Sequence, residues 1–318
     1  MPPSFVHRIT KYDPADRDEH GHYTGAEEAV SDHGPVEAAY LAAIAAFAEA
    51  SGIERLEIRE PAVTGFVFVH FGVEPSDAGH GLGDLFPPDL AGYHDGAEVS
   101  LPVALELIRV MLRDQGAWCR LEAGDVFTVH VGWDQYVYVG SDRLCVDAAA
   151  RTRELGLFPN PMATSLYAAE LEEPDVTEAA DEGFWARVRT ALASQKAVLL
   201  EEGYVRNAAR FHRLTPQNLD AVRTGLNPRA LLTVWPDLNP DVRAVFATLP
   251  EDGSTEFVWE TQDGTIRHAV VDDTEYQELA TLVVDSRAAC ALPVYLDERH
   301  PLLCAALPDN DGVLRARW

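Results

Sequence analysis

Apolar residues along the chain recur at two spacings, and each half of the sequence contains both. Recurrence every three to four residues predicts helices over about 35–51, 102–113, 184–193 and 274–285, and a further helix that Thr215 and Pro216 open. Two-residue alternation and short apolar runs predict strands. These lie near 5–10, 55–59, 66–71, 118–122, 126–131 and 136–139 in the first half, and near 197–200, 231–235, 256–260, 265–271, 292–296 and 303–307 in the second, with a last strand ending at Trp318.

The turn residues between these strands predict antiparallel neighbours. Segments 123–125 and 132–134, each containing Gly and Asp, separate three strands in the first half, and Gln262-Asp263-Gly264 joins the clearest hairpin in the second. Neither half shows the regular strand and helix alternation of a parallel doubly wound sheet, and the chain has no GxGxxG motif and no P-loop motif. The sequence therefore predicts an α+β protein of two domains, each a largely antiparallel sheet with packed helices.

The boundary between the domains is predicted from composition. At 318 residues the chain is long enough for two cores. Pro159 and Pro161 are followed by an acid-rich stretch around Pro174, which is typical of a linker. We therefore expect a His-rich domain over 1–160, a linker over 161–182 and a second domain over 183–318.

Charge narrows the classes of partner. The chain has 52 acidic and 25 basic residues, a formal net charge of -27, and only Lys11 and Lys196 are lysines. Such a field repels phosphate backbones and anionic lipid surfaces, which disfavours nucleic-acid and membrane partners and favours a basic protein. A compositional bias of the host is the alternative explanation.

Targeting signals and cysteines indicate the compartment. No apolar run approaches about 18 residues, the length of a membrane span, and residues 1–4 begin no secretion signal. Cys119, Cys145, Cys290 and Cys304 form no CxxC pair and are typical of core residues. A disulfide between Cys290 and Cys304 on neighbouring strands is the alternative. We expect a cytoplasmic protein with reduced thiols.

An acidic, histidine-containing segment near the start is a candidate metal site. Asp16, Asp18, His20, Gly21 and Glu27 match positions one, three, five, six and twelve of a calcium-binding loop, although a histidine replaces the oxygen donor at position five. The candidate ligands of a divalent metal ion are Asp16, Asp18, His20, His22 and Glu27. A solvated turn is the alternative.

Two strands of the first half share one ending. Residues 66–72 and 126–132 each finish in His, an apolar residue and Gly, which places His70 and His130 at matching positions. Facing histidines suit general acid and base catalysis on a phosphodiester. The pattern faintly resembles the two-histidine phosphoesterases, in which Ser or Thr stands where this chain has Gly72 and Gly132. Histidines bonded to backbone are the alternative.

The second half has one basic region. No acid falls between Val205 and Leu219, and Arg206, Arg210 and Arg213 are candidates to hold a phosphate or a nucleotide. Further arginines extend this basic region to Arg229. If the protein binds a nucleic acid, we expect it to do so through this region. The alternative is that each arginine is paired with a neighbouring acid.

Several segments of the first half resemble a family of bacterial, actinomycete-type proteins to which no activity is assigned. They are 7–14 (HRITKYDP), 17–23 (RDEHGHY), 118–122 (WCRLE), 129–132 (VHVG) and 136–140 (YVYVG). The resemblance implies that the first half is a domain, and it implies no functional residue.

The chain contains no GxSxG or HExxH motif and no other signature of an activated nucleophile. The function predicted first is therefore an acidic protein-binding module of the immunity, antitoxin or regulatory kind. The alternative is a hydrolase acting on a phosphoester or small metabolite through His70 and His130 or a metal-binding loop. A nucleic-acid or nucleotide binder is a third possibility.

Overall fold

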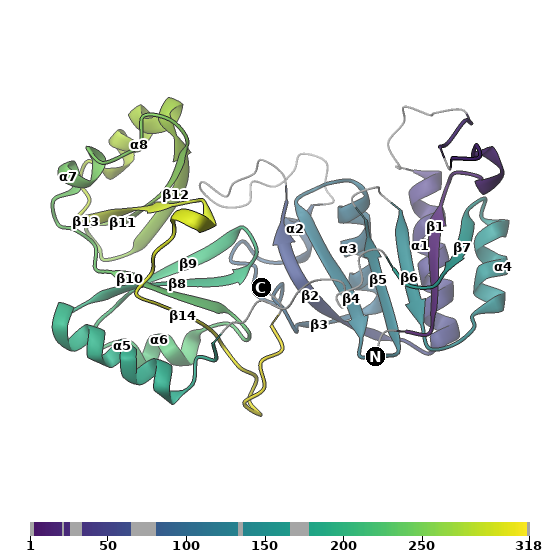
Figure 1. The fold of residues 1–318 in the computed structure, drawn as a ribbon, viewed down its shortest axis with the longest axis horizontal. Coiled ribbons are helices and arrows are strands. Elements are labelled where there is room, and N and C mark those ends of the chain that lie inside the picture. The colour runs from purple at the N-terminus through teal and green to yellow at the C-terminus, as the bar shows by residue number, and fades with distance from the viewer. Residues whose placement is uncertain are drawn as a thin grey trace. The chain divides into compact units, whose positions relative to one another are not determined.

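The computed structural model describes residues 3–20, 22–25, 34–64, 81–132, 136–165 and 178–316, and the chain forms two compact units (Figure 1). The first unit contains the described residues through 165, and the second contains 178–316. Each unit combines helices with antiparallel strands. The α+β class predicted from the sequence is confirmed.

The first unit is built on a seven-stranded sheet of order β3-β2-β4-β5-β6-β1-β7, in which every neighbouring pair is antiparallel. The predicted three-stranded meander is confirmed as β4, β5 and β6. The strands are β1 (Phe5–Thr10), β2 (Arg55–Val63), β3 (Glu98–Ser100), β4 (Ala117–Ala123), β5 (Phe127–Val131), β6 (Val137–Ser141) and β7 (Phe158–Met162).

Helices cover one face of this sheet. They are α1 (Pro35–Ser51), α2 (Leu82–Leu85), α3 (Leu101–Leu112) and α4 (Val146–Glu154), and a short 3-10 helix, η1 (Pro14–Asp16), follows β1. α1 packs against α3, α4 and β6, and its buried stripe includes Tyr40, Ile44 and Phe47. The predicted stop is confirmed, since Gly52 adopts φ 73° and its N–H bonds the carbonyls of Ala48 and Glu49.

Two elements of the first unit differ from the sequence prediction. α4 was not predicted, because its sequence VDAAARTRE contains too few apolar residues to show a periodic stripe. β7 occupies Phe158–Met162, where proline suggested the start of a linker, and pairs with β1 at the edge of the sheet. Proline is compatible with an edge strand because its missing N–H faces away from the neighbour.

The second unit contains two antiparallel sheets, of orders β14-β10-β8-β9 and β12-β11-β13. The predicted hairpin is confirmed as β11 and β12. The strands are β8 (Val198–Val205), β9 (Ala208–Leu214), β10 (Leu231–Pro236), β11 (Ser254–Glu260), β12 (Ile266–Asp272), β13 (Ala288–Pro293) and β14 (Leu303–Ala306).

The core of the second unit has two layers, separated by the three-stranded sheet. Leu199, Phe211 and Trp235 of the four-stranded sheet pack against Val258 and Leu292 of the other sheet. The opposite face of β11 packs beneath α7 (Val242–Phe246) and α8 (Tyr276–Val283). The remaining helices are α5 (Glu182–Gln195), α6 (Leu219–Gly225), η3 (Asp273–Glu275) and η4 (Leu296–Glu298).

In the second unit, two features differ from the sequence prediction: β9 and the segment after β14. A capping box of Asp272 and Glu275 opens η3, which leads into α8. β9 was not predicted, and 307–316, where a final strand was expected, contain no strand. Cys290 and Cys304 lie on strands of different sheets, and all four cysteines are free thiols.

Candidate functional site

A row of polar side chains crosses the seven-stranded sheet on the face away from the helices. Residues directly paired in an antiparallel ladder have side chains on the same face. The ladder pairs Arg59 with Arg120, Arg120 with His130, His130 with Tyr138, and Tyr138 with Arg8. We call these five residues the polar row.

The helices lie on the other face of the sheet. His7 alternates with Arg8 along β1, and its ring lies 5.1 Å from that of Phe47 in α1. In β4, Cys119 and Leu121 on that face are fully buried and alternate with Arg120. The alternation of apolar and polar residues thus assigns one face to the core and the other to the polar row.

Acidic side chains neutralise the arginines at one end of the row. The Nε of Arg59 lies 3.1 Å from Asp95 Oδ1, and its Nη1 lies 3.9 Å from Glu122 Oε2. The Nε of Arg120 lies 3.1 Å from Glu60 Oε2. All five side chains are at most 13% exposed, and such buried charges require partners of this kind.

A β-bulge brings Glu60 into its ion pair with Arg120. The register between β2 and β4 shifts between Arg59 and Ala62, and Glu60 adopts φ 51°, which is uncommon for a residue with a side chain. Its N–H donates to Asp95 Oδ1 at 2.8 Å. In a regular strand Glu60 would point to the helices, whereas the bulge brings its carboxylate to Arg120.

His130 is the member of the polar row that sequence patterns identified. Its ring stacks on Tyr138 with centroids 5.1 Å apart and an interplanar angle of 7°. Its Nε2 lies 3.4 Å from Ser165 Oγ. Burial, and secondly the positive charge of Arg120, lower the pKa of His130 to about 3. The imidazole is therefore neutral at pH 7.

This pKa limits the chemistry of His130. A general base works best when its pKa lies near the working pH, and a base with a pKa of about 3 draws a proton from a hydroxyl only weakly. The ring is suited to orienting the Ser165 hydroxyl by a hydrogen bond. His70, its predicted counterpart, lies outside the described residues, so the pairing of the two histidines stays a prediction.

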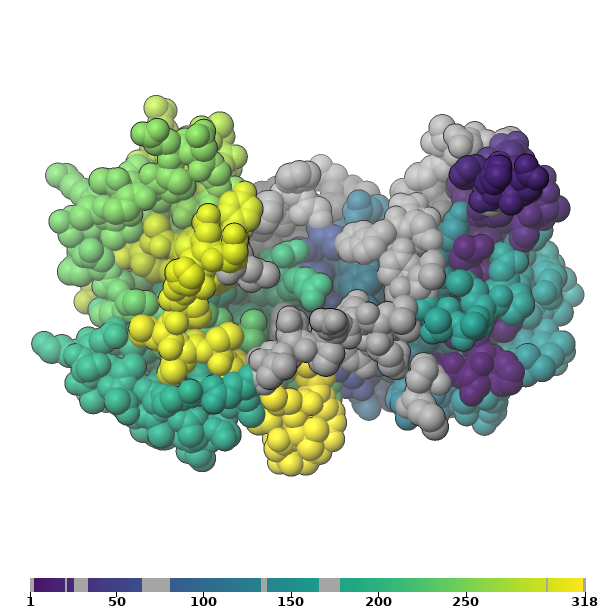
Figure 2. All heavy atoms as spheres, in the orientation of Figure 1, coloured from purple at the N-terminus to yellow at the C-terminus, as the bar shows by residue number. Residues whose placement is uncertain are grey.

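Four of the proposed metal ligands, Asp16, Asp18, His20 and His22, are described, and they are exposed in the segment after β1 (Figure 2). Asp18 Oδ1 accepts the backbone N–H groups of His20 at 2.9 Å and His22 at 2.8 Å. The carbonyl of Asp16 accepts the N–H of Thr24, and Glu27 lies outside the described residues. In the part of the chain that the structure describes, no three His, Cys, Asp or Glu side chains are grouped to hold a metal ion.

The candidate anion-binding arginines are distributed around β9. Arg206 is exposed in the turn before the strand. Arg210 and Arg213 lie on opposite faces of β9, since successive side chains of a strand alternate between faces and Arg213 is the third residue after Arg210. The Arg210 guanidinium stacks 4.4 Å from the Tyr204 ring, while Arg213 donates to both oxygens of Asp237 and to Glu260.

Sequence patterns missed the buried charges of both units. Glu201 and Glu202 stand within the apolar strand β8, which was the available signal. Glu201 accepts the Trp235 indole N–H at 2.8 Å and pairs with Arg299. Arg59 and Glu60, adjacent charges in β2, were an equivalent signal in the first unit. Adjacent charges inside a strand indicate a bulge or a buried ion pair.

The fold and these sites define an α+β protein with a charged, buried sheet face. Comparisons with protein-family models, with curated proteins and with solved structures found no match to this chain. No helix among the described residues is long and apolar enough to cross a membrane.

Proposed function

We propose that the protein is a non-catalytic binding module that engages a basic protein partner through an acidic surface of its second unit. The distribution of charge carries the proposal. Residues 237–287, which include α7, α8 and most of the three-stranded sheet, contain twelve acids and three arginines. A field of this strength accelerates association with a positively charged partner.

The exposed side of α8 supports the proposal with apolar as well as acidic groups. Leu279 and Val283 face the core, whereas Leu282 is 48% and Val284 is 74% exposed. Asp273, Glu278 and Asp285 are exposed beside them. We call Asp273, Glu278, Leu282, Val284 and Asp285 the α8 patch. An apolar centre with a charged rim is typical of protein interfaces.

Two arginines near this surface are already paired within the second unit. Arg213 is held by Asp237 and Glu260, and Arg287 also pairs with Glu260. Among the described residues, Asp273, Glu278 and Asp285 form no ion pair. Their charges therefore remain for a partner, whose lysines or arginines would replace the missing intramolecular cations.

A hydrolase is the second candidate, favoured by one observation, the 3.4 Å contact between Ser165 Oγ and His130 Nε2. The low pKa of His130 weighs against it, because the activated hydroxyl needs a base that accepts its proton. Substitution of His130 separates the two functions. The hydrolase requires loss of turnover without loss of binding to a basic partner.

The proposal includes a cytoplasmic location. The four free thiols are compatible with a reducing compartment.

A charged peptide series tests the proposed surface. The probe is a fluorescent amphipathic helix of Lys and Leu, with a Lys and Ser peptide of equal charge as its comparison. We expect the Lys/Leu peptide to bind more tightly at about 0.15 M salt, and binding to weaken as salt increases. Equal affinity for the two peptides would exclude a role for Leu282 and Val284.

Charge-neutralising variants locate the interaction. The triple variant Asp273→Asn, Glu278→Gln, Asp285→Asn should weaken binding by about tenfold or more, which is about 1.4 kcal/mol. The control, Glu49→Gln, Glu54→Gln, Glu298→Gln, changes net charge equally at exposed sites outside the α8 patch. Equal losses in both variants would mean that only net charge acts, and the proposed site would then be wrong.

A further inference from the structure

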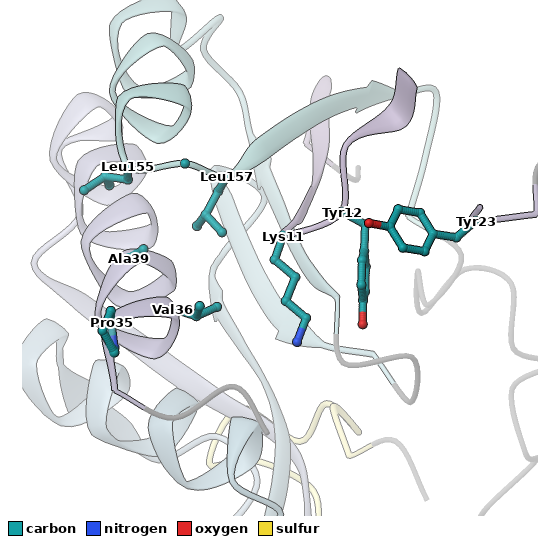
Figure 3. Close-up of a pocket in the computed structure, with 9 residues that line it drawn as sticks. Lys11, Tyr12, Tyr23, Pro35, Val36, Ala39, Leu155 and Leu157 are labelled. Atoms are coloured by element: carbon teal, nitrogen blue, oxygen red, sulfur yellow. The ribbon is translucent and has the colours of Figure 1, made fainter. Parts of the chain in front are cut away.

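The first unit contains a pocket of about 360 Å³ at the end of β1 (Figure 3). Lys11 and Tyr23 line it together with apolar residues of α1 and of the chain after α4. Desolvation, and then the negative charge of Asp16, raise the pKa of Tyr23. Charges of both signs therefore meet at this pocket and select no class of ligand. An open sheet edge in the second unit selects a partner more narrowly.

This edge is β12, the outer strand of the three-stranded sheet (Figure 1). β12 pairs with β11 over Ile266–Asp272, and among the described residues no strand pairs with its other side. The opposite edge of the sheet is partly occupied, because Asn239 and Ala289 of β13 exchange backbone hydrogen bonds of 2.8 and 2.9 Å. β12 also contains no proline. A long edge without proline is a template on which another strand can pair.

The turn before β12 shows which of its backbone groups point outward. The Thr261 N–H donates to the Thr265 carbonyl at 2.9 Å, so these two residues are a hydrogen-bonded pair of the antiparallel ladder. Such pairs alternate with non-hydrogen-bonded pairs, which makes Arg267, Ala269 and Val271 the residues bonded to β11. The residues between them direct their N–H and C=O groups away from β11. These outward-bonding residues are Ile266, His268 and Val270.

The side chains of the outward-bonding residues continue the apolar layer between the two sheets. Ile266 packs against that layer, and the His268 ring lies 4.9 Å from the ring of Phe211 in β9. Ile266 and Val270 both remain partly exposed. Paired residues of neighbouring strands have side chains on the same face. An added strand with apolar residues opposite these positions would therefore extend the layer.

The charges at the two ends of β12 differ in sign. Arg267, near the start of the strand, is exposed and forms no ion pair with any described residue. β12 ends at Asp272 and leads directly into Asp273 of the α8 patch. A strand antiparallel to β12 begins beside Asp273 and ends beyond Arg267. Basic residues at its amino end and an acid opposite Arg267 would match these charges.

We propose that the basic partner adds an extended segment to the edge of β12 as an antiparallel strand. Its backbone pairs with Ile266, His268 and Val270, its apolar side chains lie on the same face, and its basic amino end reaches Asp273. This inference rests on the proposed function, because the partner is the one that the α8 patch attracts. Backbone pairing supplies affinity, and the alternation of side chains supplies specificity.

The probe is a capped, fluorescent peptide, Lys-Lys-Val-Thr-Val-Glu-Val-Thr, whose valines lie opposite the outward-bonding residues. Fluorescence anisotropy measures its binding to the full-length protein. N-methylation of the valines removes the N–H donors that face β12, and should weaken binding by about tenfold or more. N-methylation of the threonines, whose N–H groups point away, should change affinity by less than about threefold. Equal effects of the two modifications would contradict strand addition.

A peptide of reversed sequence tests the orientation of the strand. It has the same composition and net charge, but an antiparallel arrangement places its lysines beside Arg267 rather than Asp273. We expect it to bind more weakly than the probe by about tenfold or more. Equal affinity of the two peptides would overturn the antiparallel arrangement that the charges of β12 predict.

Two variants of one residue localise the binding. Val270→Pro removes an outward N–H without removing a bond to β11, and should reduce affinity for the probe by about tenfold or more. Val270→Thr keeps the N–H and the β-branched shape, and should bind the probe within about threefold of the wild type. Circular dichroism melting confirms that each variant folds. A folded Val270→Pro protein that binds the probe like the wild type would refute the site.

The Lys/Leu helix that probes the α8 patch separates this inference from the function on which it rests. Binding of that helix without binding of the strand probe would overturn strand addition and leave the binding module standing. Failure of both probes would overturn both proposals. Sedimentation velocity without peptide checks a further occupant: dimerisation of the wild type that Val270→Pro abolishes would identify a second copy of the chain at this edge, in place of the partner.

Discussion

At His130 the loss of hydration outweighs the polar contacts of the ring. The protonated ring would be buried beside the Arg120 guanidinium, and both effects favour the neutral form. The strand and the approximate position of this histidine were predictable from two-residue alternation. Its environment was not, because Arg120 reaches it only through a ladder pair that sequence alone does not reveal. The same is true of Glu60 and Asp95.

The low pKa predicts a contribution of His130 to pH-dependent stability. Between pH 6.5 and about 3 the unfolded chain binds a proton that folded His130 does not, so the free energy of unfolding falls as pH is lowered. Above pH 6.5 this contribution is fully present. The free energy of unfolding should therefore fall less steeply between pH 7 and pH 5 in His130→Gln than in the wild type. The difference in slope should be up to about 1.4 kcal/mol per pH unit. Urea unfolding at several pH values measures it.

Burial also lowers the pKa of His7, so part of the decline should persist in the variant. An unchanged slope in His130→Gln would show that His130 titrates normally in the folded protein. His7→Gln provides the comparison on the other face of the sheet.

The buried carboxylate of Glu201 depends on Arg299. Burial raises the pKa of Glu201, while Arg299 and the Trp235 indole oppose that shift. Arg299→Met leaves the carboxylate without its cation and should lower the free energy of unfolding by about 3 kcal/mol. Arg187→Met breaks a pair with Glu178 whose side chains are 46% and 58% exposed, and should have no measurable effect. Denaturant unfolding of both variants checks the difference, and equal effects would refute it.

At the scale of elements, the helices and hairpins that could be predicted from sequence are those whose signals lie within a few residues of one another. α1 was predicted at both ends because Pro35 and Gly52 act within one helical turn. The β11–β12 hairpin was predicted because its turn contains Asp263 and Gly264. β9 and α4 were missed because neither has a periodic apolar stripe, and their place in the fold is set by packing. The division of the second unit into two sheets depends on strand pairings that are distant in sequence.

The stop of α1 can be tested with matched glycines. Gly52 has φ 73°, and an added Cβ would meet no atom within 4 Å, so Gly52→Ala changes only backbone energy. We expect a loss of about 1 kcal/mol in stability. Gly225, at the end of α6, has equal space without the positive φ, and Gly225→Ala should be neutral or stabilising. Thermal melting compares them, and similar effects would contradict the conformational explanation.

At the scale of the whole molecule, the main feature is the excess of acidic over basic residues. The arginines are largely committed to ion pairs such as those of Arg120, Arg213 and Arg229, so the surplus of acid remains. Composition predicted the sign and size of this surplus. It did not predict where the surplus lies, because exposure of the α8 patch depends on which side of α8 faces the core.

Repulsion among the surplus carboxylates predicts stabilisation by salt. Raising NaCl from about 0.01 M to about 0.5 M shortens the screening length from about 30 Å to a few ångströms, and should raise the melting temperature. KCl at matched ionic strength should have the same effect if screening is the cause. A fall in melting temperature with salt would mean that attractive ion pairs outweigh the repulsion.

The prolines of β7 bear on how the protein behaves in crowded solution. The outer edge of an edge strand normally has unpaired backbone N–H and C=O groups, with which a strand of another chain can pair. Pro159 and Pro161 stand two residues apart on that edge, so two successive donors are missing where a neighbour would begin to pair. At this edge the first unit resists the stacking of chains that leads to fibres, and it does so through the backbone rather than through charge. This protection would persist at salt concentrations that screen the acidic surface.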